Sequence, residues 1–458
     1  MSDSRPNILY IMSDDHTVNA VSAYNGWLNE AVDTPNIDRI AQEGMRFDNC
    51  ICNNSLCSPS RASIMTGQYS HKNGVLRLNR PLADDHPNFV RQLQASGYQT
   101  GIAGKWHLGS DPDGFDYWEV LPGQGDYFDP KFTRNGEPTQ YEGYATDIIT
   151  DLSLDWLKQR DSEKPFFMMC HHKAPHGLWE YAPRHADLFT DGDLPEPSNL
   201  YTQFEKVSSA FMGHERTMIH QAERMNDGVR GGEWPTGRLD TTGMSDEEKI
   251  HAGYQKYVKD YLRCITAIDE GVGRLLDYLD AEGLTDNTIV VYTSDQGMFL
   301  GEHCYFDKRL ILEESLQMPY VMRYPGVIEP GSVNKDIVMN VDFGQTYLDF
   351  VGLEADDRMQ GRSFRSLCEG TTPDDWRQSA FYAYWDGLTK HYGVRTQQYT
   401  LAVHRTGERD MFDLENDPQE MRSVYDDPAY ADAQAEVEAD LARLIEEIDI
   451  SAEQLPQE

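Results

Sequence analysis

Residues 7–15 read NILYIMSDD, a continuous apolar run that ends abruptly in two carboxylates. Three later stretches have the same form: QTGIAGKWHLG at 99–109, PFFMMCHHKAPHG at 165–177 and NTIVVYTSDQG at 287–297. Strands that are apolar throughout are buried on both faces, as in parallel sheets. Segments with helical periodicity alternate with these runs, at 35–44, 147–160, about 254–282 and 343–353. The alternation predicts an α/β fold with a central, mostly parallel sheet flanked by helices.

The last quarter of the sequence has a different pattern. Residues 379–387, 390–405 and 411–418 read SAFYAYWDG, KHYGVRTQQYTLAVHR and MFDLENDP, which indicates antiparallel strands and turns followed by a helix over 432–448. We therefore expect a large domain over 1–360 and a smaller C-terminal α+β domain over 361–458. Within the large domain, the polar segment 180–246 is rich in Gly, Pro and Asp, so we expect a loop-rich insertion that shapes access to a site.

The composition restricts the possible partners. The formal net charge is −37, from 77 acidic and 40 basic residues, and only 13 of the basic residues are lysine. A nucleic-acid partner is excluded because phosphate binding needs clustered cations. An acidic, lysine-poor surface is consistent with high salt, where screening removes self-repulsion. If the substrate is an anion, its cations must be concentrated locally.

The N-terminal sequence and the cysteines give little further information about function. No apolar run approaches the roughly 20 residues that span a bilayer, so no membrane partner is expected. The first residues, MSDSRPNILYIMSDD, lack the cationic and long apolar regions of a signal peptide. We expect a cytoplasmic protein, or an exported one if a signal was removed. Seven cysteines, an odd number at irregular spacing, do not form a disulfide framework.

Acidic and amide side chains follow two of the predicted strands. Because ligands bind beyond the carboxyl ends of parallel strands, we expect the strand-end loops to share one site. Asp14, Asp15 and Asp295 would offer three hard oxygen ligands, and Gln296 an amide oxygen. Such a set suits Ca²⁺ or Mg²⁺. The alternative is that the paired aspartates form a solvated turn.

Residues 57–67 read CSPSRASIMTG, the expected start of a helix. Ser58 or Ser60 suits a cap and Pro59 suits the first turn, but a cap does not explain Cys57. A helix N-terminus favours an anionic group, and a thiol with a lowered pKa is a nucleophile, so a cysteine hydrolase is one interpretation. That chemistry does not call for three carboxylates.

Cations and histidines complete the candidate site. Lys105 and His107 in GKWHLG, with Lys308 in FDKR, would supply the charge that an anionic substrate needs. Imidazole at a strand end could donate a proton to a leaving group. His172 and His176, which flank Lys173, follow such a strand. Taken singly, each of these residues could instead be an ordinary turn, surface or structural residue.

Together these segments resemble the type I sulfatases of the alkaline phosphatase superfamily. The signature C-x-P-S-R followed by T-G occurs at Cys57, Pro59, Ser60, Arg61, Thr66 and Gly67. The paired aspartates, GKWHLG, a histidine strand end, SDQG and a downstream lysine follow in family order over roughly residues 5–330. SDQGMFLGEH with FDKR is similar to members that act on sulfated sugars, including those of glucosamine-6-sulfatase and iduronate-2-sulfatase type.

The resemblance implies a matured nucleophile. A formylglycine-generating enzyme would oxidise Cys57 to Cα-formylglycine, whose hydrate attacks sulfur and later releases sulfate. Asp14, Asp15, Asp295 and Gln296 would bind the metal, Ca²⁺ or Mg²⁺, together with the oxygens of the modified residue 57. Gln296 departs from the Asn or His of many members, although an amide still offers an oxygen.

The resemblance also implies roles for other residues. Arg61 and Lys105 would hold the formylglycine, and His107 would bind its second hydroxyl. His176 and Lys308 would bind sulfate oxygens and help protonate the leaving oxygen, and His303 would face the sugar. Further candidates for contact with a sulfated mono- or oligosaccharide are His172, Lys173, Trp106, Trp179, Trp385, His391 and Arg395.

Two other functions remain open at this point. A phosphonate monoester or phosphodiester hydrolase of the same superfamily would use the same aldehyde and metal. A sulfated-glycan binding protein would keep the fold without maturation.

Overall fold

The computed structural model describes residues 5–456 and confirms the α/β architecture. Ten strands form one sheet in the order β13-β2-β12-β9-β1-β8-β4-β5-β6-β7. The central neighbours β9, β1, β8, β4 and β5 pair in parallel, whereas antiparallel pairs join β12 and β6 to this centre. The parallel strands are β1 (Asn7–Ser13), β4 (Gln99–Lys105), β5 (Tyr117–Leu121), β8 (Phe166–His171) and β9 (Thr288–Ser294). The outer strands are β2 (Met45–Phe47), β6 (Lys131–Arg134), β7 (Glu137–Gln140), β12 (Tyr320–Arg323) and β13 (Ser332–Asn334).

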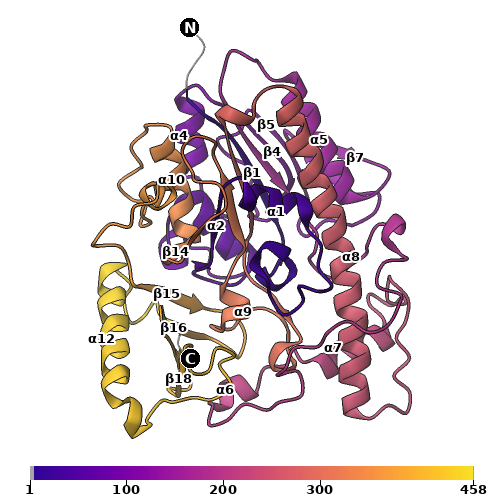
Figure 1. Ribbon diagram of the computed structural model, residues 1–458, viewed down its shortest axis with the longest axis vertical. Helices are drawn as coiled ribbons and strands as arrows, with labels where there is room; N and C mark the ends of the chain where they lie inside the picture. The colour runs from indigo at the N-terminus through magenta and orange to yellow at the C-terminus, as the bar shows by residue number, and fades with distance from the viewer. Residues whose placement is uncertain (1–4, 457–458) are drawn as a thin grey trace.

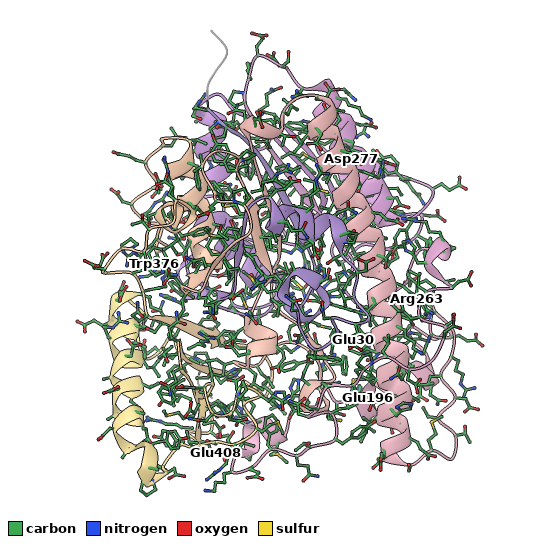
Figure 2. All side chains as sticks on the ribbon, viewed as in Figure 1. Glu30, Glu196, Arg263, Asp277, Trp376 and Glu408 are labelled. Carbon is green, nitrogen blue, oxygen red and sulfur yellow. The ribbon has the colours of Figure 1, made fainter. Side chains whose placement is uncertain are left out.

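Helices cover both faces of this sheet (Figure 1). Successive side chains of a strand point to opposite faces. Leu9 and Ile11 of β1 therefore belong to one core, and Ile8 and Tyr10 to the other. The first core includes α1 (Pro35–Gln42), α5 (Ala145–Gln159) and α8 (Asp246–Ala281). The second includes α2 (Cys57–Thr66), α4 (Phe89–Ala95) and α10 (Phe343–Phe350). Side chains fill the space between the layers, and Trp376, labelled in Figure 2, is buried in the second core.

The long helix α8 starts earlier than the sequence predicts. It begins at Asp246, where Ser245 and Glu248 form a reciprocal capping box, whereas apolar periodicity predicts a start near Tyr254. Its first turn, 246–249, consists of charged residues only, so the apolar pattern does not extend to the true N-terminus. None of the helices built from residues 5–456 has both the length and the apolar character that a bilayer crossing needs.

A four-stranded antiparallel sheet forms a separate C-terminal unit, as the alternating pattern predicts. Its strands are β15 (Ser379–Tyr384), β16 (His391–Thr396), β17 (Tyr399–His404) and β18 (Arg409–Asp413). Helix α12 (Ala431–Glu447) lies along this sheet and buries Val437, Leu441 and Leu444 against it (Figure 1).

Short elements connect these units. The helices are α3 (Ser70–Asn73), α6 (Ser209–Met212), α7 (Met218–Asp227), α9 (Glu313–Leu316) and α11 (Arg365–Cys368). Two small ladders pair β3 (Cys50–Ile51) with β14 (Val338–Met339), and β10 (Phe299–Leu300) with β11 (Phe306–Asp307). The segment 180–246 contains α6, α7 and long loops.

Candidate active site

Three polar groups meet at the carboxyl ends of the parallel strands. Asp14 follows β1, Lys105 is the last residue of β4, and Asp295 follows β9. Gly104, just before Lys105, has φ +107°, and a Cβ there would lie 1.9 Å from the backbone oxygen of His171. Only glycine allows this close approach. The local sequence therefore lets β4 bring Lys105 into the cluster.

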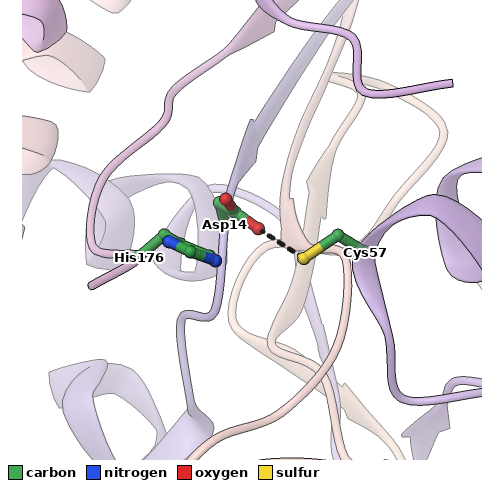
Figure 3. A group of neighbouring side chains, drawn as sticks. All are labelled: Asp14, Cys57 and His176. Carbon is green, nitrogen blue, oxygen red and sulfur yellow. Dashed lines mark hydrogen bonds between the residues drawn. The ribbon is translucent and has the colours of Figure 1, made fainter. Parts of the chain in front are cut away.

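The start of α2 brings Cys57 to the same point. Its Sγ lies 3.3 Å from Asp14 Oδ1 and 3.7 Å from Gln296 Nε2, and the side chain is 1% exposed. Figure 3 shows Asp14, Cys57 and His176 pointing toward one another from three separate segments. One ligand atom from each lies within 4.8 Å of the other two. Every residue of α2 is buried, so the helix holds the thiol firmly.

The thiol at this position is not activated. Burial and the neighbouring Asp14 carboxylate raise the pKa of Cys57 above its ordinary value. A cysteine hydrolase needs a lowered thiol pKa, so the structure argues against that interpretation.

Three buried carboxylates form a candidate metal centre. One oxygen from each of Asp14, Asp15 and Asp295 lies within 4.8 Å of the others. Gln296 donates Nε2 to Asp15, while its Oε1 is buried without a hydrogen-bond partner among residues 5–456. Rotation of the amide would turn this oxygen toward the carboxylates. Three carboxylates with that amide oxygen would be a donor set that fits Ca²⁺ or Mg²⁺.

The electrostatics of the carboxylates are consistent with such a site. Burial and the Asp14 charge raise the pKa of Asp295 to about 7. Burial also raises the pKa of Asp15, although Lys308 opposes the shift. Burial alone would raise the pKa of Asp14, but Lys105 and other cations hold it well below its ordinary value. Crowded carboxylates with raised pKa values favour an added cation.

Three cations contact these carboxylates. Arg61 donates Nε to Asp295 Oδ2 at 2.9 Å and Nη1 to the backbone oxygen of Lys105 at 2.6 Å. Lys105 donates its ammonium to Asp14. Lys308 donates Nζ to Asp15 Oδ2 at 2.6 Å. Buried charges are stable only when they are paired in this way.

The surroundings of the histidines near the cluster disfavour their protonation. Burial and Lys105 lower the pKa of His107 to about 3, and the same two causes lower the pKa of His176 well below its ordinary value. His176 Nε2 lies 3.8 Å from Asp15 Oδ2. His107 lines a smaller neighbouring cavity, and its Nδ1 has no hydrogen-bond partner among the described residues.

A cavity of about 500 Å³ opens above Cys57 and Asp15. Lys173, His176 and Lys308 line it, and Lys173 Nζ lies 4.5 Å from the ring centroid of Tyr127. Trp179 also lines it, at 3% exposed. The structure thus brings a sugar-sized cavity to the candidate nucleophile and metal centre.

Two of the expected sugar contacts lie in the protein core instead. His172 is fully buried, and its Nε2 lies 3.1 Å from Thr150 Oγ1. His303 is 4% exposed and stacks on Phe204, with 4.7 Å between ring centroids. Neither lines the cavity, because both side chains turn back into packed layers.

Three further residues that were expected to contact the sugar also lie away from this cavity. His391 is fully buried, and its Nε2 accepts from the backbone N–H of Ile311 at 3.0 Å. Arg395 pairs with Glu313 at 2.9 Å, beside a different cavity. Trp106 lies beside His107 in the smaller cavity. These three side chains are therefore left out of the proposed substrate site, as are His172 and His303. Trp385 does not line the cavity either, and donates Nε1 to the backbone oxygen of Gln454.

The sequence analysis missed several residues at the site. Gln124 accepts from Lys105 Nζ at 2.5 Å and lines the cavity, although it belongs to no motif. Arg309 directly follows Lys308 in FDKR, so this motif could have identified Arg309 as well. Arg216 and Arg224 line the cavity from the loop-rich insertion, which carries no pattern that would single them out.

Comparison with known proteins agrees with this geometry. Residues 6–353 match the Sulfatase family, and residues 301–447 match the family described as N-sulphoglucosamine sulphohydrolase, C-terminal. An N-acetylglucosamine-6-O-sulfatase of Bacteroides thetaiotaomicron is 42% identical over 487 residues, covering 97% of this chain and 86% of that protein.

Solved structures extend the comparison. A protein in complex with its substrate, D-glucosamine-2-N,6-O-disulfate, is similar with a TM-score of 0.93 at 40% identity, covering 98% of this chain and 99% of that one. A phosphonate monoester hydrolase of Agrobacterium radiobacter shares the fold, with a TM-score of 0.76 at 21% identity, covering 97% and 96%. The Sulfatase match spans most of the sequence and includes Cys57 and all three clustered carboxylates, so this chain belongs to the sulfatase family, within the alkaline phosphatase-like superfamily.

Proposed function

We propose that this sulfatase hydrolyses the 6-O-sulfate ester of an N-substituted glucosamine, at a monosaccharide or an exposed end of an oligosaccharide. One observation carries the proposal: Cys57 Sγ lies 3.3 Å from Asp14, inside a cluster of three carboxylates and beneath a sugar-sized cavity. The 42%-identical relative is an N-acetylglucosamine-6-O-sulfatase, which supports the choice of sugar. The sulfatase function is better supported than phosphonate hydrolysis, because the phosphonate monoester hydrolase shares only the fold.

We propose that Cys57 is oxidised to Cα-formylglycine by a formylglycine-generating enzyme, and that Asp14, Asp15, Asp295 and Gln296 hold Ca²⁺ or Mg²⁺. When bound, the ion supplies Lewis-acid stabilisation of charge on the sulfate oxygens. The raised thiol pKa supports the modification, because the unmodified side chain would remain a neutral thiol and a poor nucleophile.

The chain's own residues orient the nucleophile and bind the ester. Arg61 and Lys105 lie behind the carboxylates and fix their positions. Lys308 and His176 face the cavity, where Lys308 would bind sulfate oxygens. Neutral His176 Nε2, which lies beside Asp15, would hold a proton for the departing sugar oxygen once the anionic ester raises its pKa.

The test is turnover by protein produced together with a formylglycine-generating enzyme. We expect hydrolysis of N-acetylglucosamine-6-sulfate and much slower turnover of a phosphonate monoester. Mass spectrometry of the peptide that contains Cys57 should show conversion of thiol to aldehyde. Matured, metal-loaded protein that leaves the sulfated sugar intact would contradict the proposal and favour a glycan-binding role.

A further inference from the structure

The cavity wall carries a surplus of positive charge, although the whole chain has a formal charge of −37. The cations that line it are Lys173, Arg216, Arg224, Arg230, Lys308 and Arg309. The acids are Asp15, Asp126, Glu180 and Asp307. Since the rest of the surface is strongly acidic, this local reversal of sign indicates a wall built to attract anions.

The surplus is concentrated around Asp307. Arg309 Nε lies 2.9 Å from Asp307 Oδ2, Lys308 Nζ lies 3.5 Å from Oδ1, and Arg216 Nε lies 3.6 Å from Oδ2. Lys308 also pairs with Asp15, so two carboxylates face these three cations and one positive charge remains. Once Asp15 and Asp307 are counted, the remaining two acids of the wall, Asp126 and Glu180, lie near Lys173.

Arg224 adds a fourth cation to the cavity wall. Its Nη1 donates to Gln221 Oε1 at 2.9 Å, and its guanidinium lies 5.8 Å from the ring centroid of Trp234 and 5.7 Å from that of Phe306. It forms no ion pair with any carboxylate among residues 5–456. Burial and the nearby Arg216 lower its pKa, and the attraction of Asp307 offsets this shift only in part. A half-buried guanidinium without a counter-ion is costly unless a ligand supplies one.

Helix packing holds Arg224 in place. Helix α7 packs against α8. Its buried side chains on this side are Met218, Ala222 and Met225. A Cβ at Gly253 of α8 would lie 2.8 Å from Ala222 Cβ, so the two helices approach closely only because residue 253 is glycine. Gln221 is fully buried and orients the guanidinium. The cation is therefore pre-positioned before a ligand binds.

We propose that Arg216 and Arg224 form a second anion site on the cavity wall, which binds a second sulfate carried by the same sugar. The inference rests on the proposed function, in which Lys308 binds the sulfate that is removed. Asp307 contacts both Lys308 and Arg216, so the two anion sites are separated by one carboxylate. Lys308, Arg216 and Arg224 all line the same cavity, so one bound sugar could reach both sites. The enzyme should therefore prefer a disulfated sugar to a monosulfated one.

The test compares glucosamine-2-N,6-O-disulfate with N-acetylglucosamine-6-sulfate in matured wild-type enzyme and in Arg224→Met. Methionine keeps an apolar chain over the aromatic rings while removing the charge. The control is Arg238→Met, because Arg238 also contacts α7, through Asn226, but does not line the cavity. We expect the ratio of the two kcat/KM values to fall about tenfold or more in Arg224→Met, as for loss of a charge-assisted hydrogen bond. The ratio should not change in Arg238→Met.

Thermal stability distinguishes binding from a structural role. Removal of an unneutralised cation should leave the melting temperature of ligand-free Arg224→Met unchanged or raised. An unchanged kcat/KM ratio, or an equal loss on both sugars, would overturn the second anion site while leaving the proposed function intact. Failure of the wild-type enzyme to hydrolyse either sugar would overturn the proposed function, and the second site with it.

Discussion

Replacement of Lys308 by methionine tests the proposed metal centre and the proposed sulfate site together. The Lys308 side chain is 3% exposed and that of Asp15 is 2% exposed, and Nζ lies 2.5 Å and 2.6 Å from the two carboxylate oxygens. Burial alone would lower the pKa of Lys308, but Asp15 raises it well above its ordinary value. The pair is therefore ionised, and its loss leaves a buried carboxylate that lacks its closest cation.

The expected magnitude depends on the metal. Breaking a buried ion pair by removing one partner costs about 3–5 kcal/mol. We expect a loss of that order in Lys308→Met when the metal has been removed with a chelator. If Asp15 binds a divalent ion, the ion replaces the missing cation, and the loss should fall below about 2 kcal/mol in excess Ca²⁺.

The assay is denaturant unfolding with chelator and with Ca²⁺, beside kcat/KM for the sulfated sugar. A lost contact to a sulfate oxygen should lower kcat/KM by roughly 10- to 100-fold. Lys72→Met is the control, since the Lys72 pair with Asp449 is exposed and should contribute little in either condition. Equal destabilisation of Lys308→Met with and without Ca²⁺ would refute metal binding by Asp15.

Three further changes test separate parts of the structure. Cys57→Ala should abolish turnover while Cys52→Ala retains it, and both should give wild-type circular dichroism; sulfatase activity in Cys57→Ala would contradict the mechanism. Gly104→Ala should lower kcat/KM at least about 100-fold, because the added Cβ would displace Lys105. The control is Gly74→Ala, which should not lower kcat/KM, since Gly74 has φ +76° but open space around its Cβ. An active Gly104→Ala enzyme would contradict that role of the glycine. Burial lowers the pKa of His391 to about 3, so the unfolded chain binds a proton at this residue before the folded chain does as the pH falls. Between pH 7 and pH 5, the unfolding free energy of the wild type should therefore fall by about 2 kcal/mol relative to that of His391→Phe. A pH-independent difference in unfolding free energy would contradict a buried neutral imidazole.

Much of the fold could be predicted because its strands have a strong local signal. The apolar runs at 7–13 and 288–294 form neighbouring parallel strands, and the alternating segments near the C-terminus form their own sheet. Residues at strand ends, such as Asp14 and Asp295, could be grouped because parallel strands share one carboxyl edge.

The substrate contacts could not be predicted in the same way. His391 is a polar residue at a strand start, a pattern that suits a site, but the structure uses it to accept a hydrogen bond from Ile311. Arg224 reaches the cavity only through the packing of α7 on α8, which depends on residues far apart in sequence. Tertiary packing decides these positions, and no local pattern records it.

The complete burial of α2 has a consequence for biosynthesis. Cys57 is 1% exposed, and each of its nine helical successors is also buried. An enzyme that must bind the peptide around this thiol has no accessible segment of α2 to bind in the folded protein. If Cys57 is oxidised as proposed, that step would therefore precede closure of the helix against the sheet, during or just after synthesis of the polypeptide. The yield of active enzyme would then depend on the relative rates of folding and oxidation. A chain that folds before oxidation would keep an unmodified, inactive thiol.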